Sequence, residues 1–192
     1  VVTVKEECLK FSFPGAGNSY SFRTEGYRLR HLADLTYAND KLRITGVFMH
    51  SIAVELGDVA IESASLTTPG MKFLTEFQPS TSSEDVAQID SLLNRGVTSG
   101  NFVYSKEVDP RLDRTYALRV VAYRGKVVRA AGGIRYNELD YDKRRDVIVV
   151  FRIVGIEKDG ITLVWRKLSD AEPPRIKMPK AEEKDAGEGE AN

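Results

Sequence analysis

Three features of this 192-residue sequence predict an all-β fold, specifically an antiparallel β-sandwich of the jelly-roll type. About ten short segments rich in β-branched and aromatic residues follow one another, separated by turn residues. Helical periodicity occurs in one segment, and strands do not alternate with helices as they do around a parallel sheet. The segment Asp146–Leu168 contains two apolar stretches joined by a turn signal. A closed β-barrel is the alternative architecture.

The segment Asp146–Leu168 is predicted to be a buried β-hairpin around which the domain is built. Its first half is apolar on both faces, so we expect a central strand that is covered on both sides. A two-residue turn would place Arg152 opposite Lys167, and like charges facing each other across a ladder are unfavourable. A four-residue loop, residues 157–160, is therefore favoured, which places Arg152 opposite Trp165.

The remaining strands are predicted from shorter segments of alternating or β-branched residues. Gly57-Asp58 is a tight-turn signal, so the two segments beside it should form a hairpin. The predicted strands cover residues 1–13, 20–23, 27–35, 42–49, 52–56, 59–66, 71–77, 102–107 and 115–124, with an edge strand within 125–133.

One helix is predicted, around residues 84–95. Ser82 and Ser83 offer a capping hydroxyl, and the acidic residues that follow favour the positive end of the helix dipole. Apolar residues then recur at helical spacing, and Gly96 stands where a left-handed residue commonly ends a helix. The apolar stripe is Val86, Ile89, Leu92 and Leu93.

The composition predicts one globular domain, residues 1–170, followed by a polar and disordered C-terminal tail, residues 171–192. The 28 basic and 28 acidic residues give a formal net charge of zero, which lacks the overall attraction typical of nucleic-acid binders. No run of about 18 apolar residues is present. We therefore expect neither a nucleic-acid partner nor a membrane span.

No catalytic or metal-binding motif is recognisable. The single cysteine, Cys8, excludes an internal disulfide and has an acidic neighbour, which does not favour a reactive thiolate. His31 and His50 lack the spacing of zinc ligands, so we expect ordinary packed histidines. We accordingly expect no cofactor.

The strongest candidate for a binding site is the segment 135–146, which precedes the central strand and is rich in polar and aromatic residues. Loops at the rim of a sandwich often carry binding sites. Tyrosine rings can stack on sugar faces, while carboxylates and amides hydrogen-bond to sugar hydroxyls. The predicted ligand-binding residues are Tyr136, Asn137, Glu138, Asp140, Tyr141, Asp142 and Arg144.

Three other interpretations of this segment stay open. Glu138, Asp140 and Asp142 alternate as calcium ligands do, although the glycine of a calcium loop is missing. Arg135 with the basic residues 143–145 could bind phosphate. The segment could also be a charged surface loop whose acids and arginines pair with one another.

These observations predict a noncatalytic binding or interaction module for a carbohydrate or protein partner. We expect such a module to belong to an exported or cell-envelope protein, and the start at Val1 rather than methionine leaves room for a signal peptide that has been removed. One alternative is a carbohydrate-active hydrolase, whose paired carboxylates would lie about 5 to 10 Å apart. The other is a structural subunit that assembles through an exposed strand or the helix. The oligomeric state is left open.

Overall fold

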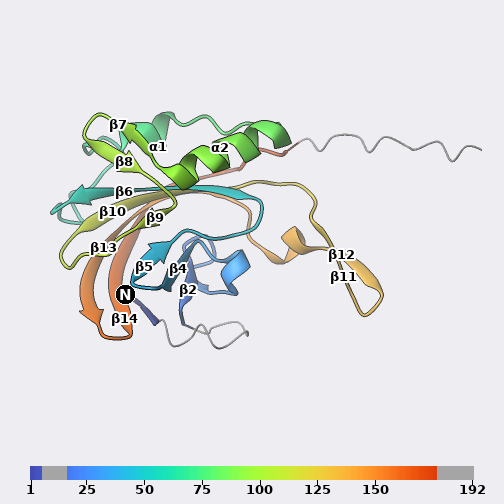
Figure 1. The fold of residues 1–192 in the computed structure, drawn as a ribbon, viewed down its shortest axis with the longest axis horizontal. Coiled ribbons are helices and arrows are strands. Elements are labelled where there is room, and N and C mark those ends of the chain that lie inside the picture. The colour runs from blue at the N-terminus through green and yellow to red at the C-terminus, as the bar shows by residue number, and fades with distance from the viewer. Residues whose placement is uncertain (6–16, 177–192) are drawn as a thin grey trace, which may run out of the picture.

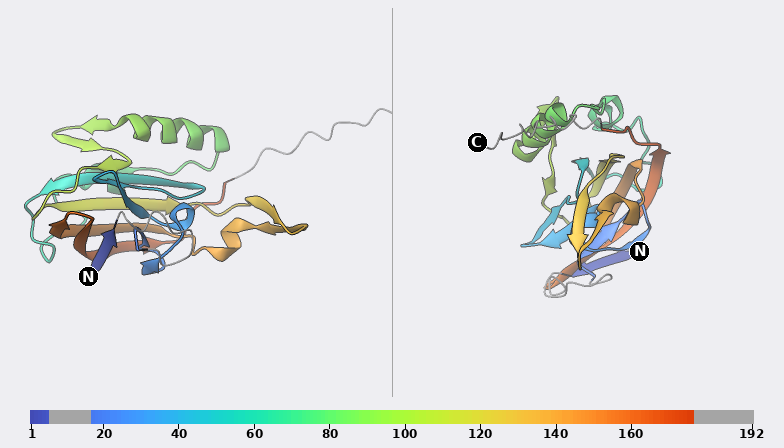
Figure 2. Two further views of the ribbon diagram at one scale, coloured as in Figure 1. Left: turned by 60° about the horizontal axis from the view of Figure 1, so that its bottom comes forward. Right: turned by 90° about the vertical axis from the view of Figure 1, so that its right-hand side faces the viewer.

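The computed structural model describes residues 1–5 and 17–176, and these residues form three layers (Figure 1; Figure 2). Two five-stranded antiparallel sheets pack face to face. A layer of helices and turns covers the outer face of one sheet. An antiparallel β-sandwich is thus confirmed, and the strands of the described part do not close into a barrel. The jelly-roll connectivity stays a prediction.

The first sheet contains the long C-terminal hairpin. Its middle strand is β13, whose first six residues, 146–151, are all buried, as expected for a strand covered on both faces. The strand order is β1 (Val2–Lys5), β14 (Gly160–Ala171), β13 (Asp146–Glu157), β10 (Thr115–Ala122) and β6 (Met49–Gly57).

The second sheet is made of short strands. Aromatic rings join it to the first sheet: Phe151 stacks on Tyr116 with ring centroids 5.2 Å apart and lies 6.2 Å from Phe22. These rings are fully buried, so this interface is the main hydrophobic core. The strand order is β3 (Gly26–Tyr27), β2 (Ser19–Ser21), β4 (Leu35–Ala38), β5 (Lys41–Arg43) and β9 (Glu107–Val108).

The third layer packs on the other face of the first sheet, where Met71, Leu74 and Leu93 lie against apolar side chains of that sheet. The predicted helix is confirmed, and it is capped by the Ser82 hydroxyl and by Gly96 at a φ of +82°. The layer consists of α1 (Lys72–Glu76), α2 (Ser83–Arg95) and the small hairpin β7 (Val97–Ser99) and β8 (Phe102–Tyr104).

A separate hairpin projects from the sandwich (Figure 1). It consists of β11 (Val128–Ala131) and β12 (Ile134–Asn137), joined by two glycines at φ +56° and +78°. We call residues 128–137 the hairpin arm. A short 3-10 helix, η3 (Glu138–Tyr141), leads from the arm back to β13.

Five strand predictions are wrong or only partly right. Residues 59–66 form turns, so the hairpin expected at Gly57-Asp58 does not exist. The predicted strand 71–77 is instead the short helix α1. Arg119 stabilises the end of this helix by donating hydrogen bonds to the carbonyls of Leu74 and Phe77. The other three segments break into short pieces. Residues 27–35 contain the 3-10 helix η2 (Arg30–Leu32), and β5 ends at Arg43 within the predicted strand 42–49. The predicted strand 102–107 is divided between β8 and β9.

The predicted four-residue loop in the long hairpin is also wrong. Glu157 pairs with Gly160 around a two-residue turn. Val154 then forms a β-bulge, because it is the extra residue between two paired neighbours, and the register shifts by one. Arg152 therefore lies opposite Val164 and not opposite Trp165.

The chain packs on the sandwich beyond the predicted domain end at residue 170. β14 runs to Ala171, Arg124 donates its backbone N–H to the carbonyl of Pro174, and Ile176 is buried. The greater part of the predicted tail, residues 177–192, lies outside the described residues. So do Cys8 and most of the first predicted strand.

Candidate functional site

The seven predicted site residues do not form one site. They divide into a group with buried side chains, a group whose polar atoms bond to neighbouring residues, and an aromatic pair of which one ring is exposed. The division follows the path of the chain, since the segment leaves the hairpin arm, passes through η3 and enters the sandwich at β13.

Asp142 and Arg144 belong to the buried group. One Asp142 oxygen accepts hydrogen bonds from Arg23 at 2.5 Å and from Arg144 at 2.8 Å. Arg23 also donates to Asp34 at 2.6 Å, and neither Arg23, Asp34 nor Asp142 exposes its side chain. The four residues form a neutral network between the second sheet and the segment before β13. A ligand would have to displace these bonds, so the geometry gives no support to a binding role for Asp142 or Arg144.

The electrostatics of this network keep both arginines charged. Burial on its own would lower the pKa of Arg23, but the charges and hydrogen bonds of Asp34 and Asp142 outweigh it, and the pKa is raised. Burial lowers the pKa of Arg144 despite the attraction of Asp142. Arginine begins from such a high pKa that it stays protonated in either case.

Asn137, Glu138 and Asp140 form the second group. The Asn137 side chain accepts from the backbone of Val127 at 2.8 Å and donates to Asp140 at 2.7 Å. Glu138 accepts from Arg129 at 2.9 Å and lies 3.1 Å from the His31 imidazole. The calcium interpretation gains no support, because no three His, Cys, Asp or Glu side chains in the described part gather as metal ligands would.

Tyr136 and Tyr141 form the third group, and their rings contact each other edge to face. Their centroids are 5.7 Å apart, and the ring planes meet at 83°. Tyr141 is 66% exposed. An edge-to-face pair of this kind does not present one flat platform on which a sugar ring could stack.

The hairpin arm beside these tyrosines carries exposed apolar residues that sequence reasoning did not assign to a site. Ile134 is 71% exposed and Val128 is 41% exposed. A signal for the arm was present, since Gly132-Gly133 is a two-residue turn signal between short apolar stretches. All four residues of β11 are exposed, and its sequence did not predict this.

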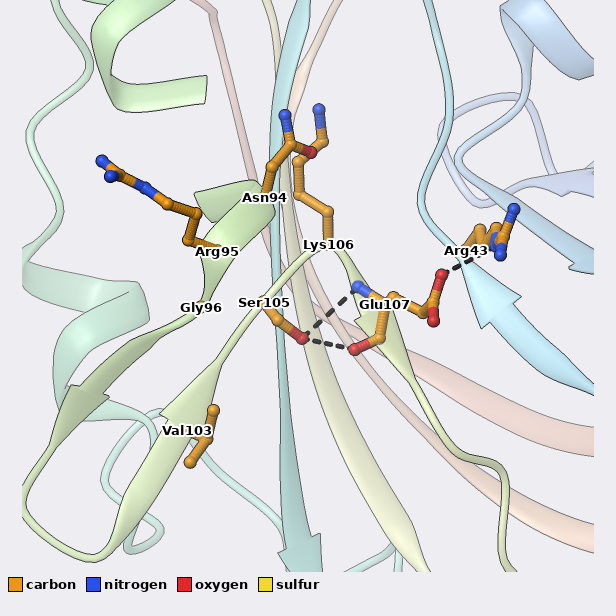
Figure 3. Close-up of a pocket in the computed structure, with 8 residues that line it drawn as sticks. All are labelled: Arg43, Asn94, Arg95, Gly96, Val103, Ser105, Lys106 and Glu107. Atoms are coloured by element: carbon orange, nitrogen blue, oxygen red, sulfur yellow. Dashed lines mark hydrogen bonds and ion pairs between the residues drawn. The ribbon is translucent and has the colours of Figure 1, made fainter. Parts of the chain in front are cut away.

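A polar pocket of about 370 Å³ lies between the end of α2, the β7–β8 hairpin and β9 (Figure 3). Two of its cations already have partners: Arg43 lies 2.7 Å from Glu107, and Lys106 lies 2.7 Å from Asp90. Figure 3 shows the Arg95 side chain directed away from these residues. The pocket is lined by Arg43, Asn94, Arg95, Gly96, Val103, Ser105, Lys106 and Glu107.

Glu107 is the one carboxylate in this lining. A hydrogen bond from Lys41, 2.8 Å away, and the nearby Arg43 lower its pKa. A glycosidase needs a second facing carboxylate and a carboxyl group whose pKa is raised so that it can act as the acid. The pocket provides neither, so the hydrolase alternative gains no support from it.

Comparison of the chain with protein-family models, with curated proteins and with solved structures found no match. No helix within residues 1–5 and 17–176 is long and apolar enough to cross a membrane. The class of protein is therefore defined by the fold alone: an antiparallel β-sandwich with one helical layer and a projecting hairpin arm.

Proposed function

We propose that the chain is a noncatalytic protein-binding module and that it contacts its partner through the hairpin arm. The observation that carries this proposal is the exposure of Ile134 and Val128 on the two faces of the hairpin arm, which projects from the sandwich, and of Tyr141 in the adjoining η3 (Figure 1). Exposed apolar side chains on a projecting part of a fold are typical of interaction surfaces.

The energetics of the arm support the same conclusion. A two-stranded hairpin is at best marginally stable in water when nothing packs on it. Full burial of an isoleucine side chain contributes about 1.5–3 kcal/mol, so covering the exposed part of Ile134 would contribute about 1–2 kcal/mol. Partner binding is the simplest way for the arm to gain this energy.

A protein partner is favoured over a carbohydrate. The two tyrosine rings stand edge to face, whereas sugar recognition uses a ring face that is open to the ligand. The register of the arm places Ala131 opposite Ile134 and Arg129 opposite Tyr136, so these four side chains share one face. Apolar and aromatic side chains with an arginine are the residue types enriched at protein interfaces.

The experiment compares partner recovery by the wild type and by Ile134→Asp, with the tagged full chain as bait and mass spectrometry as readout. Val103→Asp is the matched control, because Val103 is 60% exposed on another hairpin, β7–β8. We expect at least one protein to be recovered by the wild type and by the control, and to be lost with Ile134→Asp.

Hydrogen exchange of the recovered complex then locates the contact. We expect slower exchange of the amides in residues 128–137, since the partner covers the arm. Recovery that is equal for Ile134→Asp and Val103→Asp contradicts the proposal, provided that circular dichroism shows both variants to be folded.

A further inference from the structure

Two pockets that share lining residues lie at the base of the arm. The first, of about 320 Å³, is lined by Gly125, Lys126, Asn137, Arg175 and Ile176. The second, of about 290 Å³, is lined by Lys126, Val128, Arg135, Tyr136 and Asn137. The two pockets share Lys126 and Asn137 and so lie next to each other, and we call them together the arm groove.

The arm groove contains three cations, Lys126, Arg135 and Arg175, and no carboxylate in its lining. In the described part of the chain these three side chains have no ion-pair partner, whereas the neighbouring Arg124 and Arg129 pair with Glu172 and Glu138. The sequence from residue 114 to residue 137 contains no acidic residue. Among the residues that the structure describes, the groove is therefore a concentration of unpaired positive charge, on a chain whose formal net charge is zero.

We propose that the arm groove binds an extended acidic peptide segment of the partner protein, an inference that rests on the proposed function and adds the chemistry of its ligand. The three cations would bind glutamate or aspartate side chains of the peptide. Val128 lines the same groove and offers an apolar contact between the charges.

The backbone of the arm supports an extended ligand. β11 pairs with β12 and, among the described strands, with no other, so each strand has one open edge. An extended peptide can add to such an edge through main-chain hydrogen bonds, and side-chain contacts then provide specificity.

The observations favour an acidic polypeptide over the other occupants. Nucleic-acid binding of useful strength commonly involves about 6–10 phosphate contacts, more than three cations supply. A second copy of the chain would bring Lys126 and Arg135 against their own counterparts in a two-fold contact, which is repulsive. The chain's own continuation after Ile176 presents Lys177 and Lys180 before its first acid.

The test uses fluorescence anisotropy of a labelled peptide of alternating glutamate and valine, about 12 residues long, added to the full chain at low salt. The same peptide with glutamine in place of glutamate measures the charge requirement. We expect the glutamate peptide to bind and the glutamine peptide to bind at least about tenfold more weakly. An oligothymidine of similar length serves as the nucleic-acid probe.

The decisive variant is the double substitution Lys126→Gln with Arg135→Gln. We expect it to weaken binding of the glutamate peptide about tenfold or more, because two of the three groove cations are lost. The matched control, Lys72→Gln with Lys158→Gln, removes the same charge at exposed positions elsewhere and should leave the affinity unchanged.

The inference is overturned by equal binding of the two peptides, by equal weakening by the two double variants, or by tighter binding of the oligothymidine. A severalfold gain in affinity on Glu182→Gln with Glu183→Gln would also overturn it, because the chain's own segment would then be the occupant. Recovery of a partner that depends on Ile134, without any effect of the groove substitutions, would leave the proposed function standing and refute the groove.

Discussion

Removal of one carboxylate from the buried network decides whether Asp142 is a structural residue or a ligand-binding residue. In Asp142→Ala, Arg23 and Arg144 both lose the oxygen that accepts their hydrogen bonds. Two buried arginines then face one carboxylate, Asp34, so an uncompensated charge remains. Breaking a buried pair in this way costs about 3–5 kcal/mol. For a domain of this size that corresponds to a fall in melting temperature of about 6–20 °C.

The assay is urea unfolding followed by circular dichroism, with the free energy of unfolding taken from the midpoint at constant slope. Asp140→Ala is the matched control, because Asp140 is exposed two residues away in the same segment. We expect the control to change stability by less than about 0.5 kcal/mol. A cost below about 1 kcal/mol for Asp142→Ala, or equal costs for the two variants, would refute the structural assignment.

Three further predictions concern stability. Burial lowers the pKa of His50, so as pH falls from about 7 to 5 the unfolded chain takes up a proton before the folded chain does. Wild-type stability should therefore fall over this range more than that of His50→Gln in thermal unfolding, and parallel curves would contradict this. In Gly160→Ala the new Cβ would lie 2.6 Å from the carbonyl oxygen of Val4, so we expect a loss of about 1–3 kcal/mol in urea unfolding. Gly155→Ala, whose nearest contact is 3.4 Å, should change stability by less than about 1 kcal/mol, and a similar loss in both variants would argue against the clash. Ser82→Ala removes the cap of α2 and should cost about 1 kcal/mol in the same assay, whereas no change would show that the cap is dispensable.

Sequence reasoning predicted the elements whose local signals are strong. β13 reads as a continuous apolar run, which only a strand covered on both faces can bury, and its position in the middle of the first sheet follows from that. α2 combines a capping serine, a helical apolar period and a terminal glycine, so its limits were predictable to within one residue.

The region between β6 and α2 was mispredicted because short apolar segments do not distinguish strands from other buried structures. Residues 71–77 show a weak alternation of apolar and polar residues, which suggested a strand. In the structure Leu74 lies on a helix and is buried, and its carbonyl accepts a hydrogen bond from Arg119. The partner that stabilises α1 lies 45 residues further along the chain, beyond the reach of local patterns.

The buried charge network escaped prediction for the same reason. Arg23 and Asp142 are separated by 119 residues, and the run of charges after Asp142 has the composition of a solvated loop. Arg144 nevertheless donates to the backbone carbonyl of Val47, which shows that its surroundings are protein and not water.

The segment 135–146, predicted as one binding loop, divides into two parts because only one part of it packs against the core. Residues after η3 enter the sandwich, where a buried charge is stable only when it is paired. Asp142 and Arg144 are paired there with each other, and Asp142 also with Arg23. Residues before η3 lie on an arm without a core of its own, so Ile134 stays exposed and Arg135 stays unpaired among the described residues. A partner stabilises most where apolar side chains are exposed and charges are unpaired. The arm, together with the groove at its base, is therefore the part of the described fold that can gain most from a partner.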